Sequence, residues 1–422
     1  MKNQKDLKVA LLGRKLSHSF SPQIHALLAD YEYRLQELEP EVVGGFLQKG
    51  EFDALNVTIP YKKTVMPYLA EISEQARKIG SVNTITRTEN GLRGDNTDYY
   101  GFSFMLRRSG IEVEGKKVLV LGSGGASVTV KAVLADLNAG QIITVSRSGE
   151  NNYDNISAHY DAEVIVNTTP VGMYPENGKA AVCLDDFKAC EGVLDLIYNP
   201  ARTKLLCDAK RLGIKYANGL SMLVAQAKLA SELFMGCAIP DEEIDRVLGI
   251  MEAQSENIVL VGMPGSGKST AGRALAKKLG REFVDTDSMV EAVSGITIPE
   301  IFEKYGEDEF RKREHFAACE AGKRSSLVIA TGGGIIKREE NYIPLSQNSK
   351  IVFLDRDINT LPVDGRPLSQ ANPLEKLYEE RLPLYIKFSD AKAQCEPEVE
   401  KTVQNILDAL EAEGRKYETA CD

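Results

Sequence analysis

The sequence predicts α/β units built on parallel sheets, and two observations support this fold class. Short apolar strands alternate with longer helical patterns along most of the 422 residues, which is typical of parallel sheets covered by helices. The strands carry Val, Ile and Leu at successive positions, as strands buried on both faces do. A chain of this length holds about two to four domains of roughly 100–200 residues each.

Each expected strand is a short apolar run that ends near turn residues. In chain order, the expected strands are Lys8–Gly13, Ala54–Pro60, Lys117–Gly122, Gln141–Ser146, Glu163–Asn167, Gly192–Ile197, Asn257–Gly262, Leu327–Thr331 and Lys350–Leu354. Two of these strands run directly into glycine-rich loops that each open a helix. The chain therefore contains two separate patterns of the kind that bind nucleotides.

Composition and charge narrow the classes of partner. Hydrophobic residues make up 43% and charged residues 27%, which excludes a disordered or collagen-like chain. The net charge of −10 argues against nucleic acids and anionic membranes, because both attract cationic surfaces. No apolar run approaches the roughly 20 residues of a transmembrane helix. We expect a soluble cytoplasmic protein with small-molecule partners, and homo-oligomerisation is left open.

No two of the seven cysteines are spaced as CxxC. The sequence therefore lacks the motif that would indicate a zinc ribbon or thioredoxin-type chemistry. Their sparse, odd number predicts reduced, buried thiols in a cytosolic protein.

The second glycine-rich loop, 262–269, fits the pattern GxxxxGK[ST] between an expected strand and an expected helix. In this pattern backbone N–H groups curl around a phosphate, Lys268 reaches the β- and γ-phosphates, and the Ser269 hydroxyl binds Mg²⁺. The pattern predicts binding of ATP or GTP, and the small size of the module favours a small-molecule kinase. The expected nucleotide-binding residues are Gly262, Gly265, Ser266, Gly267, Lys268, Ser269 and Thr270.

Further charged residues follow the phosphate loop in this half of the chain. Asp285 and Asp287 stand two apart at a strand end, so one carboxylate can serve a Mg²⁺ shell and the other an acceptor hydroxyl. Arg311 can clamp a carboxylate with two hydrogen bonds. Each of these motifs, taken alone, is equally consistent with a plain structural role: a solvated turn for the two aspartates and a charged helix face for Arg311.

Five motifs follow the phosphate loop: DTD at 285–287, FRKRE at 310–314, GGG at 332–334, RPL at 366–368 and RLPLY at 381–385. Together with the phosphate loop, and in this order, they resemble shikimate kinase over about 257–411. The resemblance implies ATP and Mg²⁺ as cofactors. It implies that Asp287 meets the shikimate hydroxyls and accepts or orients the 3-hydroxyl proton, and that Asp285 serves Mg²⁺. The other implied residues are Arg311 and Arg381 at the carboxylate, Gly333 and Gly334 against the ring, and Arg366 closing from a lid onto the phosphoryl group. The segment between Leu354 and Arg366 is short, so the adenine contacts stay unassigned.

The first glycine-rich loop belongs to a strand, turn and helix pattern over 117–127. It reads GxGxx followed by a small residue, Ser127, where Gly or Ala is usual in dinucleotide-binding folds. After the next strand, Ser146-Arg147-Ser148 stands where an NAD site would have an acidic residue, and arginine with hydroxyls suits the 2′-phosphate of NADP. The expected cofactor residues are Gly122, Ser123, Gly124, Gly125, Ala126, Ser146, Arg147 and Ser148.

Polar motifs before and after this unit are SHSFSP at 17–22, NVTIPYK at 56–62, SVNT at 81–84, GDNTD at 94–98, DLIYNP at 195–200 and MLVAQ at 222–226. Each alone fits a turn or helix cap. In this order they resemble shikimate dehydrogenase over about 8–249. The resemblance implies that NADPH reduces 3-dehydroshikimate and that Lys62 and Asp98 bind and protonate the forming alkoxide; which of the two delivers the proton is open. It further implies Ser19, Ser21 and Tyr198 at the substrate carboxylate, and Thr58, Asn83 and Gln226 at the ring hydroxyls.

Two further residues of this half, His18 and Asn151, bear on local structure and on the NADP preference. His18 neighbours the serines, and we expect a structural role for it. Members of the dehydrogenase family often carry a second arginine near the position of Asn151, so the strength of the NADP preference is open.

The working hypothesis is a bifunctional enzyme in which the dehydrogenase makes shikimate and the kinase phosphorylates it. The expected domains are a substrate domain at 1–101 with a returning helix at 219–250, a Rossmann domain at 102–218, a linker at 251–256 and a P-loop kinase domain with a lid at 257–415. The alternatives are a quinate-active or NAD-preferring dehydrogenase fused to the kinase, and a metabolite-binding regulator with inactive sites. The intact Lys62, Asp98, Lys268 and Asp287 argue against the regulator.

Overall fold

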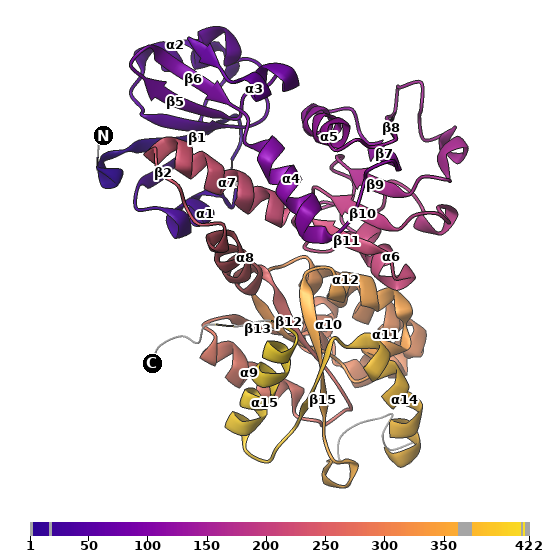
Figure 1. Ribbon diagram of the computed structural model, residues 1–422. Helices are drawn as coiled ribbons and strands as arrows, with labels where there is room; N and C mark the ends of the chain where they lie inside the picture. Colours follow the sequence, from indigo (N-terminus) through magenta and orange to yellow (C-terminus); the bar gives the residue numbers. More distant parts are fainter. Residues whose placement is uncertain (1–2, 17–18, 362–373, 415–416, 418–422) are drawn as a thin grey trace. The chain divides into compact units, whose positions relative to one another are not determined.

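The computed structural model of the chain describes residues 3–16, 19–361, 374–414 and 417. These residues form two compact units (Figure 1). The first unit comprises Met1–Val171, Ala180–Tyr198 and Asp208–Leu248. The second unit comprises Gly172–Lys179, Asn199–Cys207 and Gly249–Asp422.

The first sheet of the first unit has six strands in the order β2-β1-β3-β5-β6-β4. Strand β1 pairs in parallel with β2 and β3, whereas β5 pairs antiparallel with β3 and β6. The antiparallel part departs from the parallel expectation because the short turn Glu89-Asn90 suffices to join β5 to β6. The strand bounds are β1 (Lys8–Gly13), β2 (Glu32–Glu37), β3 (Ala54–Val57), β4 (Glu71–Ile72), β5 (Thr84–Thr88) and β6 (Gly91–Asp95).

Helices cover both faces of this sheet. Neighbouring residues of β1 point to opposite faces: Val9 packs with Phe234 of α7, and Leu12 packs with Val43 and Leu47 of α2. Helix α1 packs against α7, and Ala76 of α3 joins the core on the α2 face. The helix bounds are α1 (Ser21–Leu28), α2 (Pro40–Lys49), α3 (Glu74–Ile79) and α7 (Leu220–Met235).

The second sheet of the first unit has five parallel strands in the order β11-β10-β9-β7-β8. Phe102 of α4 and Val130 of α5 pack on the same face of this sheet, over Val118 and Val166. Helix α4 ends at Ser109, because Gly110 adopts a left-handed conformation with φ 62°. The bounds are β7 (Lys117–Leu121), β8 (Gln141–Val145), β9 (Val164–Asn167), β10 (Gly192–Asp195), β11 (Lys215–Asn218), α4 (Asp98–Ser109), α5 (Gly125–Asp136), α6 (Lys204–Leu212) and α8 (Glu242–Ser255). The stretch 251–255 therefore belongs to helix α8.

The sheet of the second unit has five parallel strands in the order β13-β14-β12-β15-β16. Ile258 of β12 packs with Leu275 of α9 and Ile406 of α15, whereas Val259 packs with Ala318 of α11 and Tyr385 of α14. Helices α9 and α15 therefore cover one face of the sheet, and the longer helices α11 and α14 cover the other face. The bounds are β12 (Asn257–Val261), β13 (Glu282–Asp285), β14 (Leu327–Ala330), β15 (Ser349–Asp355), β16 (Ala391–Gln394), α9 (Lys268–Lys278), α10 (Thr286–Ser294), α11 (Ile298–Gly322), α12 (Tyr342–Ser346), α14 (Leu374–Phe388) and α15 (Val399–Ala412).

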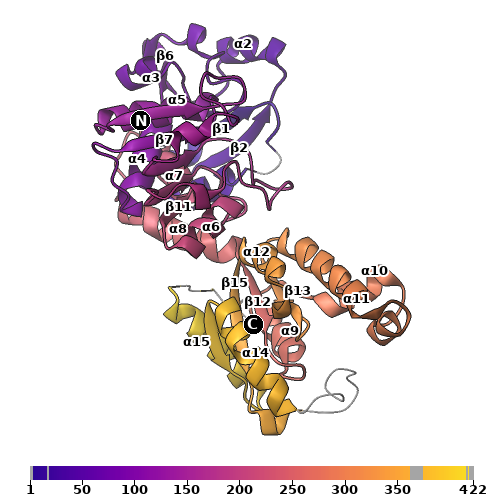
Figure 2. The same cartoon turned by 90° about the vertical axis from the view of Figure 1, so that its right-hand side faces the viewer.

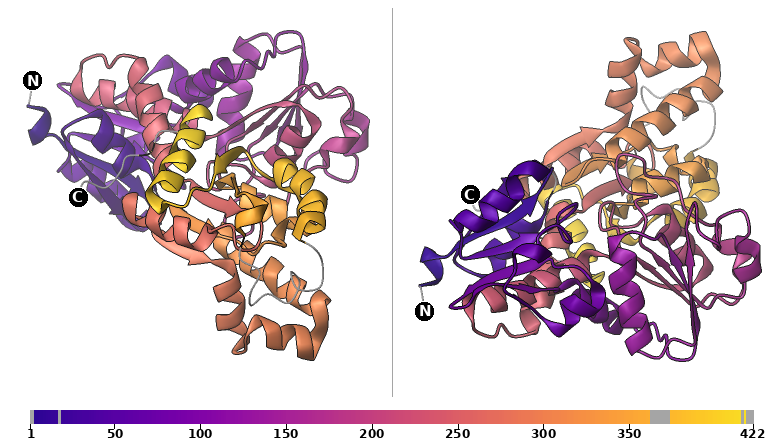
Figure 3. Two further views of the ribbon diagram at one scale, coloured as in Figure 1. Left: turned by 90° about the horizontal axis from the view of Figure 1, so that it is seen from below. Right: turned by 90° about the horizontal axis from the view of Figure 1, so that it is seen from above.

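Helices α10 and α11 stand out to one side of this sheet, as two further views show (Figure 2 and Figure 3). The strand β13 ends at Asp285, where α10 begins, so the two carboxylates of the DTD motif lie at the junction of strand and helix. This arrangement places the motif at the carboxyl ends of the parallel strands, where ligands bind in open α/β sheets.

The predicted α/β class is confirmed, and all expected strands occur, most of them shorter than expected at one end. Among the described helices, none joins the length and the apolar character that crossing a membrane requires. The six described cysteines are free thiols. Cys190 and Cys207 are buried as expected, but Cys183 and Cys237 are exposed, because both lie in loops outside the packed elements.

Candidate active sites

The phosphate loop follows β12 and leads into α9. Gly265 and Gly267 take positive φ values of 84° and 92°, and a Cβ added to Gly262 would stand 2.5 Å from the carbonyl oxygen of Leu354. These positions therefore require glycine. Helix α9 begins without a side-chain cap at Gly267, so its first N–H groups are available to bind an anion.

Lys268 and Ser269 lie at the start of α9 and contact different residues of the site. The Lys268 Nζ donates to the carbonyl oxygens of Gly262 and Met263 at 3.0 and 2.9 Å, which holds the ammonium across the loop. The Ser269 hydroxyl donates to Asp285 Oδ2 at 2.7 Å. A hydroxyl and a carboxylate oxygen at this distance suit Mg²⁺, which prefers oxygen ligands. The residues present therefore fit the predicted metal site.

A cavity of about 620 Å³ opens beside this loop. Its wall brings together predicted residues from the loop, from the DTD motif and from three later segments. They are Gly265, Gly267, Lys268, Ser269, Thr270, Asp285, Asp287, Arg311, Gly333, Gly334 and Arg381. Gly262 and Ser266 belong to the loop but not to this wall. The predicted Arg366 lies outside the described residues, as does most of the segment expected to form the lid.

Two buried carboxyl oxygens lie close to Gly332, in the wall of the cavity. Asp287 Oδ1 and Glu314 Oε1 have no hydrogen-bond partner among the described residues. A Cβ added to Gly332 would lie 2.5 and 3.0 Å from them. Burial, followed by the charges of Asp285 and Glu314, raises the pKa of Asp287 to about 6. Buried acceptors without donors are rare in folded proteins, so these oxygens are suited to receive the hydroxyls of a polyol.

Two guanidinium groups reach the cavity from different helices. Arg311 of α11 donates to Glu314 and Glu307 at 2.7 and 2.9 Å. Arg381 of α14 donates to the Gly333 carbonyl oxygen at 3.0 Å, and its buried Nε has no partner among the described residues. Arginines from two elements can bind a carboxylate between them.

Sequence reasoning gave no role to Glu314, an acidic residue of the cavity wall. It is buried with 1% side-chain exposure, and burial raises its pKa. The available signal was its position three residues after Arg311, since residues three apart share one face of a helix.

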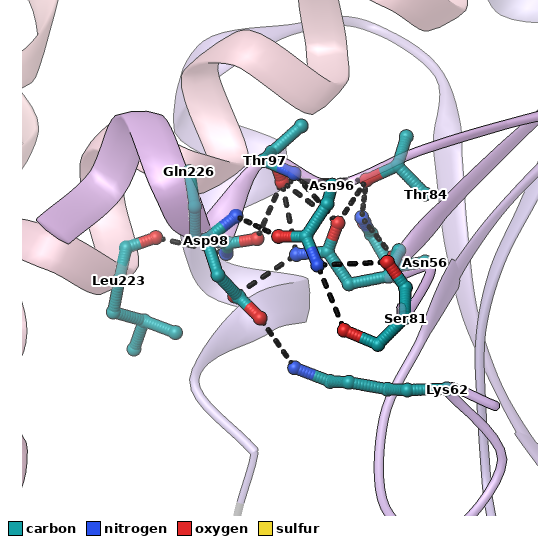
Figure 4. A network of polar contacts seen from close by, with 10 residues as sticks. Asn56, Lys62, Ser81, Thr84, Asn96, Thr97, Asp98, Leu223 and Gln226 are labelled. Atoms are coloured by element: carbon teal, nitrogen blue, oxygen red, sulfur yellow. Dashed lines mark hydrogen bonds and ion pairs between the residues drawn. The ribbon is translucent and has the colours of Figure 1, made fainter. Parts of the chain in front are cut away.

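In the first unit, Lys62 and Asp98 form the polar pair that the sequence predicts (Figure 4). The Lys62 Nζ donates to Asp98 Oδ2 at 2.6 Å, and the Asn83 amide donates to Asp98 Oδ1 at 2.9 Å. The side chains of Lys62 and Asp98 are 28% and 16% exposed. Both oxygens of Asp98 thus already accept a hydrogen bond, while the lysine is the more accessible partner.

A buried amide network supports this pair (Figure 4). Asn83 Oδ1 accepts from the Thr97 N–H at 2.7 Å, and the Thr97 hydroxyl donates to Gln226 Oε1 at 3.3 Å. Gln226 lies on α7, so this helix contributes to the network. The returning helix expected at 219–250 is two helices, α7 and α8, because Gly236 ends α7 in a left-handed conformation. Asn96 donates to the Ser81 carbonyl oxygen at 2.9 Å. The Thr58 hydroxyl takes no part in this network within the described residues.

Ser19 and Ser21 lie together where α1 begins. The Ser21 N–H donates to Ser19 Oγ at 3.2 Å. The ring of Phe20 packs on Tyr198 with centroids 5.3 Å apart, which brings Tyr198 beside the serines. Burial raises the pKa of the Tyr198 phenol, so it stays a hydrogen-bond donor. His18 lies outside the described residues.

The dinucleotide loop follows β7. Gly122 has a φ of 104°, and a Cβ there would stand 2.7 Å from Thr168 Oγ1, so only glycine fits. Residues 123–126 are exposed, and α5 begins without a side-chain cap at Gly124. Ser127 is fully buried, as a residue packed between helix and strand should be. This geometry is that of a phosphate-binding turn.

The segment after β8 presents Arg147 and Ser148 to solvent. The Ser146 N–H donates to the Asn151 carbonyl oxygen at 3.1 Å. The side chain of Asn151 is engaged with His159 Nε2 at 2.9 Å. Asn151 therefore shapes the loop from within, and Arg147 is the cation of this segment.

These two units define a class: a dinucleotide-dependent dehydrogenase and a P-loop kinase in one chain. Family models narrow the class, since residues 264–411 match shikimate kinase and residues 11–85 match the shikimate dehydrogenase substrate binding domain. The shikimate dehydrogenase (NADP⁺) of Clostridium beijerinckii is 38% identical over 262 residues, which cover 57% of this chain and 97% of the relative. The chain therefore belongs to the shikimate dehydrogenase family and also carries a shikimate kinase domain.

Solved structures agree with this assignment. A chorismate mutase/shikimate 5-dehydrogenase fusion protein from Clostridium acetobutylicum is 38% identical with a TM-score of 0.56, covering 58% of this chain and 96% of that one. Shikimate 5-dehydrogenase from Thermus thermophilus, in complex with NADP(H) and shikimate, is 29% identical with a TM-score of 0.52, covering 57% and 98%.

Proposed function

We propose that the chain catalyses two consecutive reactions: NADPH-dependent reduction of 3-dehydroshikimate to shikimate, and ATP-dependent phosphorylation of shikimate to shikimate 3-phosphate. The observation that carries the proposal is the presence, on one chain, of the Lys62–Asp98 pair in the dehydrogenase region and of the Lys268–Asp287 cavity in the kinase region. The product of the first reaction is the substrate of the second. A cytoplasmic location stays a prediction, which the free thiols favour.

In the dehydrogenase, bound NADPH supplies the hydride to the ketone carbon. The ketone oxygen then needs a proton and a positive partner. We assign both to Lys62, because its Nζ is the more exposed member of the pair and both Asp98 oxygens already accept hydrogen bonds. Asp98 orients the ammonium and balances its charge. Ser19, Ser21 and Tyr198 hold the substrate carboxylate in this proposal, and Asn83 and Gln226 address its hydroxyls.

In the kinase, ATP with Mg²⁺ supplies the phosphoryl group. Ser269 and Asp285 hold the metal, and Lys268 neutralises charge on the transferring group. Asp287 takes the proton of the attacking hydroxyl, and its raised pKa of about 6 suits it to that task near neutral pH. Arg311 and Arg381 bind the shikimate carboxylate against Gly333 and Gly334.

A coupled assay tests the proposal. With 3-dehydroshikimate and NADPH alone, the purified chain should oxidise NADPH and accumulate shikimate. Adding ATP and Mg²⁺ should convert the shikimate to a phosphorylated product without a second enzyme. Failure to form shikimate would overturn the dehydrogenase assignment, and formation of shikimate without its phosphate would overturn the kinase assignment. Running quinate with NAD⁺ in parallel distinguishes the alternative dehydrogenase specificity.

Arg147→Ala tests the cofactor preference. Loss of the guanidinium removes a charge-assisted contact with the 2′-phosphate, so the KM for NADPH should rise by roughly tenfold or more. The KM for NADH should stay unchanged, because NADH lacks that phosphate. Steady-state kinetics with both cofactors measure the effect, and an equal change for NADPH and NADH would contradict it.

A further inference from the structure

A set of partly and fully buried polar side chains behind the dehydrogenase site has no role in the mechanism above. They lie on α1, β2 and β3 of the first unit and in the turn before β2, and they are His25, Tyr31, Tyr33 and Asn56. We propose that Tyr33 and Asn56 are positioning residues that join the carboxylate-binding serines to the Lys62–Asp98 pair. This inference rests on the proposed dehydrogenase function.

The first link joins α1 to Tyr33. Ser21 and His25 are four residues apart on α1, so both side chains share one face of the helix. The His25 ring stacks on the Tyr33 ring with centroids 4.0 Å apart and an interplanar angle of 10°. His25 thus connects Tyr33 to the helix whose first residue is Ser21. Tyr33 therefore supports the end of α1 that carries the serines.

The second link joins Tyr33 to Asn56. The Tyr33 hydroxyl donates to Asn56 Oδ1 at 2.8 Å. Burial raises the pKa of Tyr33 well above its usual value, so the phenol keeps its proton at physiological pH. Asn56 is only 5% exposed, and hydrogen bonds in such surroundings are directional and costly to break. Its amide oxygen is thereby fixed, which also fixes the direction of its NH₂ group.

The third link reaches the catalytic pair (Figure 4). The Asn56 Nδ2 donates to the Asn83 carbonyl oxygen at 3.4 Å and to Thr84 Oγ1 at 3.3 Å. Asn83 in turn donates to Asp98, which accepts from Lys62. A path of hydrogen bonds therefore runs from Tyr33 through Asn56 to the Lys62–Asp98 pair. The stack of His25 on Tyr33 joins this path to helix α1, which begins at Ser21.

The path has a consequence for the reaction. A substrate held by its carboxylate at the serines must present its ketone to Lys62, so the separation between the two groups decides whether transfer is productive. Small misplacements of a bound substrate reduce rates strongly. The Tyr33–Asn56 bridge sets that separation and thereby selects substrates whose carboxylate lies at a fixed distance from the carbonyl.

The test compares Tyr33→Phe with Tyr31→Phe in the full chain. Tyr31 is a matched control, because its hydroxyl is 2.7 Å from both His25 Nδ1 and Ser231 Oγ and does not contact Asn56. Tyr33→Phe should raise the KM for 3-dehydroshikimate roughly three- to tenfold, the size expected for one hydrogen bond. The KM for NADPH and the kinase turnover of the same chain should stay unchanged. Tyr31→Phe should leave all of these values near wild type.

A second substrate separates positioning from general destabilisation. The methyl ester of 3-dehydroshikimate lacks the carboxylate charge, so the wild-type preference for the acid over the ester should shrink in Tyr33→Phe and not in Tyr31→Phe. Equal behaviour of the two variants, or an unchanged preference in Tyr33→Phe, would overturn the inference. A wild-type chain that reduces neither compound would instead overturn the proposed function.

Discussion

Lys62→Ala is expected to lower dehydrogenase turnover by about 10²- to 10⁴-fold, the range for loss of a general acid. The variant loses the ammonium that donates to Asp98 Oδ2 at 2.6 Å, and with it the proton and positive charge next to the forming alkoxide. Kinase turnover by the same chain should stay near wild type, because Lys268 and Asp287 belong to the other compact unit. Steady-state assays of both activities on one preparation measure the difference.

Two further variants complete this experiment. Lys63→Ala removes the neighbouring lysine, which is exposed, and it should leave both activities intact. Lys268→Ala should show the reverse pattern, with kinase turnover lost and dehydrogenase turnover kept, because this ammonium is held across the phosphate loop. If Lys62→Ala removed both activities or neither, the assignment of separate sites would be wrong.

The strands that sequence reasoning found differ from those it missed in their composition. The run Val118–Leu121 is fully buried and continuously apolar, so its pattern predicts a buried strand. Strand β5, by contrast, reads Thr-Ile-Thr-Arg-Thr and joins the sheet through antiparallel pairing with β3 and β6. Its polar positions face hydrogen-bonded neighbours or solvent, and such pairing is set by the rest of the sheet rather than by local sequence.

The functional sites also differ in whether consecutive residues or distant residues of the chain form them. The phosphate loop is predictable because its function depends on a few consecutive residues with fixed backbone geometry, such as Gly262 and Gly267. The hydrogen bond from Tyr33 to Asn56 is not predictable in this way, because the two residues are 23 positions apart in the sequence. Their side chains meet only when β2 and β3 flank β1 in the folded sheet. Glu314 lies between these cases, since helix spacing links it to Arg311 but only packing shows that its second oxygen faces Asp287.

Asp287→Asn is expected to lower kinase turnover by about 10²-fold or more, because the amide cannot accept the proton of the attacking hydroxyl. The wild-type kcat/KM should fall as the pH drops through about 6, where Asp287 becomes protonated. The variant should show no such step. Asp308→Asn, a change of an exposed aspartate on α11, is the matched control and should keep the wild-type profile.

Asp287→Asn should also be more stable than wild type at high pH. The sign of this change in stability follows from the direction in which the pKa of Asp287 is shifted. The pKa of Asp287 is raised in the folded chain to about 6, above the value of about 3.9 in an unfolded chain. The folded state therefore binds this proton more tightly, and the stability that this gives is lost as the pH rises through about 6. At pH 8 the wild type holds a buried charge that Asp287→Asn lacks, so the variant should gain about 1–3 kcal/mol in the free energy of unfolding. The gain should vanish toward pH 4.

Hydrogen exchange at the amides of β12 and β14 can follow this effect, because both strands lie in the core of the second unit and exchange there reports large-scale unfolding. Protection at pH 8 should increase in Asp287→Asn and stay unchanged in Asp308→Asn. Equal protection of wild type and Asp287→Asn at pH 8 would show that burial of the charge has no net cost. An increase would mean that the kinase keeps an ionised, destabilising carboxylate because the transfer reaction needs a base at that point.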